Sequence, residues 1–372
     1  MTDATPIAAT GRPASAILLL VSGLGVGGAE RLTLQLARGL VESGWRVIVV
    51  GLETDVELLE QVDTTGFDVR ALNMSRRPTD IARGLLELIR IVRRERIGLI
   101  HAHLFHSLVV GYLLRMIAPR ARVVFTSHNY GGFSPRRAAF LHWTRVLRDA
   151  DILFGPDQHP ELNTRRVSII PNGVPFDAHR APRRAPSERE PVRFLYLGRL
   201  TPEKHVDLLI RAMAEIEAMR RDGRISGIAR CELWISGDGP TRPKLEQLVD
   251  QLALRGLVRF LGMQSRVAPL FEQCHALVMA SEYEGLPMAV LEAGAVAMPV
   301  IAPPVGGLPT ILGDRCGYLT APSGLVATMI DVLRDPQESL RRGARLRQRV
   351  GERFSMQSCL SGHLDLYRAV LQ

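Results

Sequence analysis

Short apolar runs alternate along the chain with longer stretches in which apolar residues recur every three or four positions. The short runs predict strands, the longer stretches predict helices, and their alternation predicts βα units around parallel sheets. Strands are expected at 16–22, 45–52, 67–72, 98–102, 123–127, 151–154 and 167–170, and again at 192–197, 231–235, 258–261, 276–279 and 300–302. Helices are expected near 28–42, 78–96, 106–117, 135–149, 203–221, 241–253, 266–273, 288–296 and 323–333, with two more from Gln337 onward.

The βα pattern stops once and then restarts, which predicts two domains in the 372 residues. The interruption is rich in proline and arginine and has no apolar period, so we expect an exposed linker there. The expected α/β architecture is two Rossmann-like βα domains facing a cleft, because ligands of open α/β sheets bind outside the carboxyl ends of the strands. The expected segments are a flexible tail at 1–14, a first domain at 15–176, the linker at 177–191, a second domain at 192–353 and a C-terminal helix at 354–372 that packs back toward the first domain.

Composition excludes several classes of protein. Apolar residues make up 46% of the chain and charged residues 23%, which argues against a disordered, collagen-like or disulfide-stapled protein. The net charge of +9 is compatible with nucleic acid, anionic lipid or phosphorylated metabolites and does not choose among them. The four cysteines form no CxxC pair, and no apolar stretch suggests a signal core or a membrane span, so a cytoplasmic protein is expected.

The turn after the first expected strand, residues 22–31, is rich in glycine. Gly23, Gly25 and Gly28 match the G-x-G-x-x-G pattern of dinucleotide sites, and Glu53 follows the second strand. Glycine lets backbone amides approach an anion closely, and the following helix N-terminus adds partial positive charge. Three interpretations stay open: dinucleotide binding, another phosphate ligand, or a tight turn that needs glycine for left-handed backbone.

The turn after the strand at 192–197 carries two cations. Lys204 is one of only two lysines among 47 basic residues, so it is more informative than an arginine. Thr201 and Pro202 suit a helix start, which leaves Arg199 on the loop and puts Lys204 in the first helical turn. A guanidinium fork and an ammonium together match a diphosphate, and a bound anion would offset the unfavourable position of lysine at a helix N-terminus.

A third turn carries two carboxylates, Glu284 in the loop and Glu292 within the helix that follows. Carboxylates accept hydrogen bonds from hydroxyl groups, so they favour the hydroxyl-rich parts of a ligand. The amides around Gly285 and Leu286, at the helix start that Pro287 marks, are left for a phosphate oxygen. A ligand with a central diphosphate and polyols at both ends, such as a nucleotide sugar, would use all three turns.

The spacing Glu284-x7-Glu292 in EYEGLPMAVLEA resembles the EX7E signature of retaining glycosyltransferases of family 4, which have the GT-B fold. Further segments fall in that family's order: GGAER at 27–31, HAH at 101–103, PNGV at 171–174, GRLTPEK at 198–204, SGDGP at 236–240 and VGGLP at 305–309. The resemblance implies an enzyme that moves a hexosyl group from a nucleoside diphosphate sugar to a hydroxyl acceptor in polysaccharide, glycolipid or other glycoconjugate biosynthesis. It also implies that the first domain takes the carbohydrate or lipid-linked acceptor and the second binds the donor.

The resemblance assigns roles to individual residues. Arg199 and Lys204 are expected to hold the diphosphate, Glu284 to contact the transferred sugar, and His128 to lie near the sugar and the acceptor; these four are the expected catalytic residues. The expected donor-binding residues are Gly27, Gly28, Gly237, Gly285, Leu286, Pro287 and Glu292, the last of them on the ribose hydroxyls. The expected acceptor-side residues are His103, Glu30 and Arg31.

Two features depart from the family's pattern. Thr310 stands where the family carries a glutamate after the VGG-type turn, which bears on the donor contacts. The segment 155–166 is shorter than the helix that the family has there and contains two prolines, which bears on the acceptor side.

Four histidines, His101, His103, His106 and His128, raise the question of a metal. His101 and His103 would point to one side of a strand, but no cysteine or carboxylate lies beside them in sequence, and Asp238 stands alone in SGDGP. We therefore expect no metal and no cofactor, with the charge of the leaving group neutralised by the two cations and by backbone dipoles.

The helices expected at 78–96 and 135–149 carry arginines beside apolar residues. The simplest interpretation is a solvated face over core residues. The functional interpretation is weak adhesion to an anionic membrane that presents a lipid-linked acceptor, at the inner face of the membrane. No helix-turn-helix, zinc or aromatic RNA-binding motif is present, so nucleic acid is not an expected partner.

Two other functions stay open. A nicotinamide-dependent oxidoreductase would explain GLGVGG at 23–28 and Glu53 but leaves GRLTPEK and EYEGLPMAVLEA without a role. A protein that binds nucleotide sugar without catalysing transfer would use the same turns as the enzyme.

Overall fold

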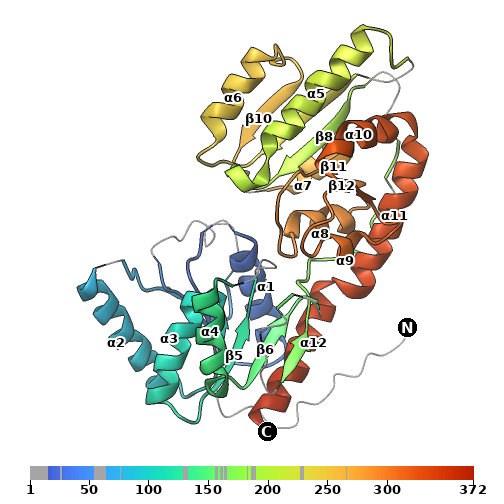
Figure 1. Ribbon diagram of the computed structural model, residues 1–372. Helices are drawn as coiled ribbons and strands as arrows, with labels where there is room; N and C mark the ends of the chain where they lie inside the picture. The colour runs from blue at the N-terminus through green and yellow to red at the C-terminus, as the bar shows by residue number, and fades with distance from the viewer. Residues whose placement is uncertain are drawn as a thin grey trace, which may run out of the picture. The chain divides into compact units, whose positions relative to one another are not determined.

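The structure is a computed structural model, and it describes residues 16–25, 27–53, 64–75, 77–128, 133–155, 158–159, 162, 166–181, 183–185, 190–226, 230–264 and 266–372. These residues divide into two compact units, each built on a sheet (Figure 1). Unit 1 consists of the described residues from Ala16 to Ile170 together with Cys359–Gln372, and unit 2 of those from Pro171 to Ser358. The tail expected at 1–14 lies outside the described residues.

Unit 1 contains a parallel sheet in the order β3-β2-β1-β4-β5-β6-β7. Both β1 and β2 are buried along their whole length, as expected of inner strands covered on both faces. The strands are β1 (Ala16–Val21), β2 (Val47–Gly51), β3 (Asp68–Ala71), β4 (Ile97–His103), β5 (Arg122–Thr126), β6 (Ala150–Leu153) and β7 (Val167–Ile169).

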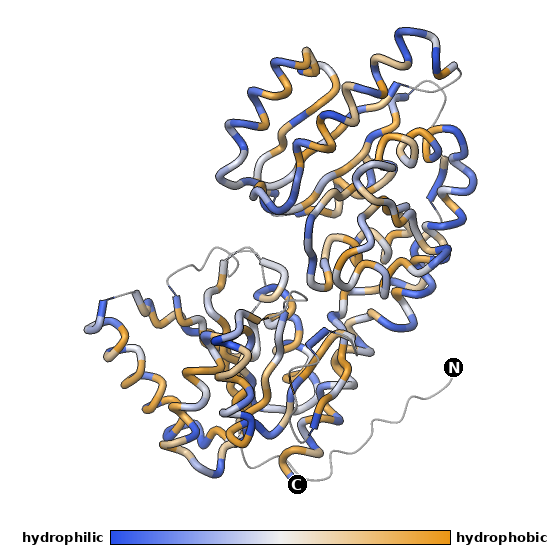
Figure 2. The backbone as a smooth tube through the Cα atoms, viewed as in Figure 1, coloured by the Kyte–Doolittle hydropathy of each residue, from blue (hydrophilic) through white to orange (hydrophobic). Residues whose placement is uncertain are grey.

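Helices cover both faces of this sheet. The elements are α1 (Gly28–Glu42), α2 (Pro78–Arg94), α3 (Leu104–Ile117), α4 (Pro135–Trp143), the 3-10 turn η2 (Arg145–Leu147) and α12 (Met356–Leu371). Leu88, Leu108 and Leu141 place α2, α3 and α4 on one face, in a core that includes Ile100 and Ala102 of β4. The alternation of polar and apolar positions along α2 is visible in Figure 2 and explains why one side of this helix is buried.

The C-terminal helix α12 packs on the opposite face of the unit 1 sheet. Gly39 of α1 allows this approach, because a Cβ there would lie 2.7 Å from Cδ2 of Leu360. On the same face, Tyr367 shares a 2.6 Å hydrogen bond with Nδ1 of His101, whose Nε2 lies 2.7 Å from Oγ1 of Thr126. A buried hydrogen-bonded chain therefore joins α12 to β4 and β5.

The histidines of this face are held neutral. Burial lowers the pKa values of His101 and His103 well below the ordinary 6.5. Burial also lowers the pKa of His363, on α12, to about 4, although its hydrogen bond to the carbonyl of Cys359 opposes that shift. These rings therefore serve unit 1 as uncharged packing and hydrogen-bonding groups at neutral pH.

Unit 2 repeats the architecture with a parallel sheet in the order β10-β9-β8-β11-β12-β13. Its strands are β8 (Val192–Leu197), β9 (Cys231–Ser236), β10 (Val258–Gly262), β11 (Ala276–Val278), β12 (Val300–Ala302) and β13 (Tyr318–Leu319). Its helical elements are η3 (Pro202–Lys204), α5 (Val206–Arg221), α6 (Arg242–Gln251), α7 (Ala268–Gln273), α8 (Met288–Ala295), α9 (Leu308–Leu312), η4 (Pro322–Gly324), α10 (Leu325–Arg334) and α11 (Pro336–Arg353).

The two parallel sheets with flanking helices confirm the predicted α/β class. The sequence pattern missed β13 and α9, because two and five residues are too short to show a period. Within the segment expected to be an exposed linker, Arg183 donates to the carbonyls of Phe271 and Cys274, so this arginine is bound to unit 2. Among the described residues, no helix has both the length and the apolar character that a bilayer-spanning segment requires.

We expect the free energy of unfolding to fall as the pH drops from 6.5 toward 4. Below 6.5 the unfolded chain takes up a proton at His363 that the folded chain does not accept until about 4, so this stabilising contribution is present above pH 6.5 and lost below it. In the His363→Gln variant, the free energy of unfolding should depend less steeply on pH, by up to about 1.4 kcal/mol per pH unit. Urea unfolding between about pH 7 and 5 measures this slope.

The matched control is His142→Gln, which removes an exposed histidine from α4. The pH dependence of the free energy of unfolding is compared between the two variants. A His363→Gln protein whose stability follows the native pH dependence would show that buried His363 does not contribute to it.

Candidate functional site

Four loops of unit 2 leave the same edge of its sheet. They follow β9, β8, β11 and β12, which are consecutive neighbours in the sheet, and the carboxyl ends of parallel strands share one edge. The loop after β9 carries Gly237, the loop after β8 carries Arg199 and Lys204, and the loop after β11 carries Glu284. The fold therefore collects the donor residues that the sequence indicated onto one edge of unit 2.

The loops after β8 and β9 lie in backbone contact. Gly237 has φ +136°, and a Cβ on it would lie 1.9 Å from the carbonyl oxygen of Gly198. The amide of Leu200 donates to the carbonyl of Asp238 at 2.8 Å, and that of Thr241 donates to the carbonyl of Leu200 at 3.1 Å. Glycine at 237 thus has a backbone reason that is independent of any ligand.

The loops after β11 and β12 approach each other in the same way. Gly306 has φ +55°, and its Cβ would lie 1.8 Å from the carbonyl oxygen of Glu284. The amide of Gly307 donates to the carbonyl of Gly285 at 2.9 Å. The backbone of Glu284 is therefore held by a loop from the next strand.

The helix expected from Thr201 is interrupted. Pro202 starts only the 3-10 turn η3, His205 then adopts a left-handed conformation at φ 46°, and α5 begins at Val206. The hydroxyl of Thr201 donates to Oε1 of Glu203 at 2.7 Å instead of capping a helix, and this bond is the main cause of the lowered pKa of Glu203. Lys204 therefore stands at the end of a tight turn that precedes the long helix.

Lys204 and Glu284 form an ion pair. Nζ of Lys204 lies 2.7 Å from Oε1 of Glu284, with side-chain exposures of 16% and 9%. The amide of Glu282 donates to the carbonyl of Glu203 at 2.9 Å, which joins the two loops a second time. Two charges this deeply buried require each other, because either one alone would lack compensation for its lost hydration.

Arg199 differs from Lys204. Its backbone carbonyl accepts a 2.7 Å hydrogen bond from the hydroxyl of the buried Tyr196, which fixes the loop, while its side chain is exposed. Within the described parts of the chain, the guanidinium of Arg199 makes no hydrogen bond or ion pair. It is the cation of this edge that is open to a ligand.

The third candidate region begins α8. Pro287 is its N-cap residue, no side chain caps the helix, and Glu292 lies half-buried on it. Leu286 is buried, and its carbonyl accepts a 3.2 Å hydrogen bond from Nδ2 of Asn172. The other polar atom of Asn172, Oδ1, is buried and has no hydrogen-bond partner in the part of the chain described here.

The glycine-rich turn of unit 1 does not use left-handed glycine. Its described glycines have no positive φ, and Gly27 is extended at φ −136°. A Cβ on Gly27 would lie 2.1 Å from Oε2 of Glu30, so the glycine makes room for a carboxylate that folds back over the turn. The interpretation that this turn needs glycine for a left-handed backbone is therefore wrong. Glu30 and Arg31 lie in the first turn of α1.

His103 and His128 come together at the carboxyl edge of the unit 1 sheet. His103 ends β4, and His128 follows the neighbouring β5. Nδ1 of His103 and Nε2 of His128 are 2.9 Å apart, and burial lowers the pKa of His128 to about 3. Nε2 of His103 is buried without a hydrogen-bond partner in the described chain, and no three metal-binding side chains converge within the described ranges.

Sequence reasoning missed two residues of the unit 2 edge. Asn172 supports the backbone before α8, and Gly306 allows the loop that holds Glu284. Both lie in segments noted for their family likeness, PNGV and VGGLP, yet neither received a role. Two features of the sequence departed from the family's pattern. The first, Thr310, lies in α9, where its carbonyl accepts a 3.0 Å hydrogen bond from Arg349. Much of the second, the segment 155–166, lies outside the described residues.

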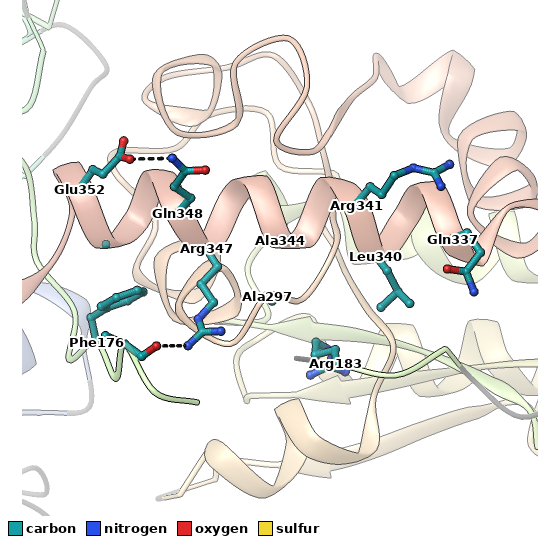
Figure 3. A pocket seen from close by; sticks show the side chains of 12 residues that line it. Phe176, Arg183, Ala297, Gln337, Leu340, Arg341, Ala344, Arg347, Gln348 and Glu352 are labelled. Atoms are coloured by element: carbon teal, nitrogen blue, oxygen red, sulfur yellow. Dashed lines mark hydrogen bonds between the residues drawn. The ribbon is translucent and has the colours of Figure 1, made fainter. Parts of the chain in front are cut away.

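Unit 2 also has a hollow of about 670 Å³ along α11 (Figure 3). It shares no lining residue with the four loops. Arg347 donates to the carbonyls of Asp177 and Ala178 there, and Arg183 is bound to backbone as described above. Both arginines thus donate to backbone carbonyls, although Nε of Arg347 is buried without a hydrogen-bond partner in the described chain, and we assign the hollow no ligand.

Two family models match consecutive parts of the chain. The model "Glycosyltransferase Family 4" matches residues 26–178, and the model "Glycosyl transferases group 1" matches residues 178–351. Together they match residues 26–351, which include most of both units and all of the expected catalytic, donor-binding and acceptor-side residues.

Curated relatives agree with these matches. The D-inositol 3-phosphate glycosyltransferase of Streptomyces avermitilis is 29% identical over 74% of this chain and 66% of its own length. A phosphatidylinositol N-acetylglucosaminyltransferase subunit of Homo sapiens is 27% identical over 80% of this chain and 63% of its own length. The chain thus spans less than two thirds of either relative.

Solved structures share the fold. Anabaena Alr3699/HepE, in complex with UDP and glucose, superimposes with a TM-score of 0.81 at 19% identity, over 95% of this chain and 99% of that one. The sucrose-phosphate synthase of Thermosynechococcus elongatus superimposes with a TM-score of 0.78 at 22% identity, over 95% and 99%.

Gly306→Ala should destabilise unit 2 and weaken nucleotide binding. A left-handed alanine costs about 1–2 kcal/mol, and the clash with the Glu284 carbonyl should add about 1–3 kcal/mol. Gly223→Ala is the matched control, because Gly223 also has positive φ, at +70°, and open space around its Cβ position. Urea unfolding and UDP titration compare the two variants; equal losses would show that the interlocked loops do not hold Glu284.

Proposed function

Because the chain belongs to the glycosyltransferases of family 4, we propose that it transfers a sugar from a nucleoside diphosphate sugar to a hydroxyl acceptor with retention at the anomeric carbon. The observation that carries this proposal is the buried pair of Lys204 and Glu284 at the carboxyl edge of unit 2, with the open cation Arg199 on the same loop. A cation pair for diphosphate and a carboxylate for sugar hydroxyls are what such a donor requires.

In this proposal, donor binding redistributes the charges of the site. The diphosphate bridges Arg199 and Lys204, which releases Glu284 to accept hydrogen bonds from hydroxyls of the transferred sugar. The bond between the anomeric carbon and the diphosphate oxygen breaks, and the acceptor oxygen forms the new bond. The acceptor proton passes to the departing phosphate, whose charge the two cations stabilise.

The remaining donor residues fit the same assignment. The uncapped N-terminus of α8 offers amides to a phosphate oxygen, and Glu292 on that helix is proposed to accept from the ribose hydroxyls. Gly27 and Gly28 are proposed to face the donor phosphates, with Gly237 beside the nucleotide. For the first donor to test we choose a UDP-sugar, since the Anabaena protein of the same fold binds UDP.

The acceptor is proposed to be a polyol or a lipid-linked saccharide, in line with the inositol-containing names of the two relatives. His103, His128, Glu30 and Arg31 of unit 1 are proposed as the acceptor side. A neutral His128 can orient a hydroxyl by hydrogen bonding without adding charge. We place the reaction in glycoconjugate or polysaccharide biosynthesis, at the cytoplasmic surface of an anionic membrane.

A UDP-sugar that is the donor should stabilise the protein by about 2.7 kcal/mol at a hundredfold excess over its dissociation constant. A thermal-shift panel of UDP-, GDP- and ADP-sugars identifies the donor, and product NMR with a defined acceptor panel gives the anomeric configuration. We expect an α-configured donor to give an α-linked product. A β-linked product would refute retention, and binding without transfer to any acceptor would favour a non-catalytic nucleotide-sugar-binding protein.

Lys204→Ala should lower turnover by about a hundredfold or more, since one donor to the departing charge is lost. The measurement is steady-state transfer with the identified donor. Lys244→Ala is the matched control, because it removes the chain's other lysine from an exposed position on α6. Native turnover in Lys204→Ala would show that Lys204 does not stabilise the leaving group.

A second variant guards against simple misfolding, because Lys204→Ala leaves Glu284 buried and unpaired. Glu284→Gln keeps the shape of the side chain and an amide oxygen that can accept the hydrogen bond of Lys204, and it removes the negative charge. It should keep UDP affinity within a fewfold of the native value and lower transfer strongly, because Glu284 is proposed to face the sugar and not the diphosphate. Loss of UDP affinity equal to the loss of turnover would contradict that assignment.

A further inference from the structure

We propose that unit 1 docks on an anionic lipid bilayer through one defined surface, the α3–α4 patch. The patch consists of the exposed apolar side chains of Leu113, Met116, Ile117, Trp143, Val146 and Leu147. This inference rests on the membrane contact included in the proposed function and names the surface that makes it.

The exposure of these side chains is unusual for their size. Trp143 is 79% exposed, Met116 78% and Val146 71%. The same helices do contribute apolar residues to the core: α3 buries Leu108 and Tyr112, and α4 buries Leu141. The exposed apolar residues therefore belong to helices that already have a buried face. A contiguous set of large apolar side chains on a surface indicates an interaction site.

The members of the patch lie side by side in space. Arg115 of α3 donates to the carbonyl of Leu147 at 3.1 Å, which holds η2 against the end of α3. Thr144 donates to the hydroxyl of Tyr112 at 3.1 Å, and Tyr112 also contacts the ring of Phe140 at a centroid distance of 6.1 Å. Figure 1 shows α3 and α4 as neighbours on one face of unit 1.

The chain segment that carries the patch contains basic residues and no acidic ones. From Leu104 to Arg148 the sequence contains no aspartate or glutamate and seven arginines: Arg115, Arg120, Arg122, Arg136, Arg137, Arg145 and Arg148. Asp149, the first acid beyond this stretch, is bound by Arg115 and Arg122. Arg120 and Arg145 are exposed and follow the patch residues Ile117 and Trp143 closely in the chain. Arg136 and Arg137 are also exposed, but they lie at the start of α4, where Arg137 packs over the ring of Phe105.

These features select a bilayer as the occupant. A second copy of the chain bound through the same patch would bring two arginine-rich segments together, and like charges oppose such an interface. An anionic bilayer supplies acyl chains for the apolar residues and headgroups for the arginines. The interfacial region of a membrane also suits a tryptophan such as Trp143.

Docking through the patch leaves the carboxyl edge of unit 1 open. His103 precedes the first residue of α3 and Ile117 is its last, so the patch lies roughly 20 Å along the helix from the histidine pair, at 1.5 Å per residue. The membrane contact and the acceptor residues therefore do not compete for the same surface of the unit.

The test is co-sedimentation of the full-length protein with phosphatidylcholine vesicles, with and without about one third phosphatidylglycerol. The native protein should sediment with the anionic vesicles only, and less in about 0.5 M salt, where headgroup charges are screened. Trp143→Ser with Val146→Ser, and separately Arg120→Glu with Arg145→Glu, should each weaken binding about tenfold or more. Equal sedimentation with neutral and anionic vesicles, or native binding by both double variants, would overturn the proposal.

Two controls and one further outcome make the result specific. Met263→Ser and Arg211→Glu remove an exposed apolar and an exposed basic side chain from unit 2 and should leave vesicle binding unchanged. If the protein ignores vesicles but self-associates in a way that Trp143→Ser with Val146→Ser abolishes, the patch is a protein interface and the proposal is wrong. Transfer to a water-soluble acceptor should be unaffected by the patch variants, so failure of docking and failure of the proposed enzyme activity are separately visible.

Discussion

The ion pair between Lys204 and Glu284 is the constraint around which the unit 2 site is arranged. Each charge is largely withdrawn from water and lies within hydrogen-bonding distance of the other, so neither loop can move alone without leaving a buried charge uncompensated. Such a pair contributes little to stability compared with a well-packed apolar contact. We propose that its role is to hold both charges in place for a ligand that offers each of them a better partner.

The backbone around the pair is rigid for a different reason. Gly237 and Gly306 let loops from neighbouring strands approach so closely that a Cβ at either position would overlap a carbonyl oxygen. These contacts fix the loops to one another before any ligand binds. A site assembled on such a scaffold loses little conformational freedom on binding, which favours both affinity and the stabilisation of developing charge.

Unit 1 buries neutral polar rings on one face of its sheet. Its buried rings at His101, His103 and His363 are neutral, and α12 is held to the sheet by hydrogen bonds and packing. Unit 1 also buries an ion pair, between Arg148 and Asp151 at 2.8 Å, and it carries exposed arginines near the α3–α4 patch. The two units therefore share an architecture, and each buries an ion pair. The pair of unit 2 lies at the carboxyl edge of its sheet, where we propose that the donor binds, and the pair of unit 1 lies at the start of β6.

The sequence by itself determined the α/β class and the parallel strands. It also determined that the candidate charged and glycine residues lie in turns between a strand and a helix. The spacing of apolar residues and the positions of glycine, proline and lysine are local features of the sequence. They predict helices, strands and turns directly, because each element forms largely from its own residues. It could not reveal that Lys204 pairs with Glu284, 80 residues apart, or that Gly27 makes room for the carboxylate of Glu30. It could not reveal that Asn172 supports Leu286 or that Trp143 stays exposed beside Leu147. Those facts depend on distances between elements, which only packing in three dimensions sets, and pairing and burial then decide the charge and exposure of each side chain.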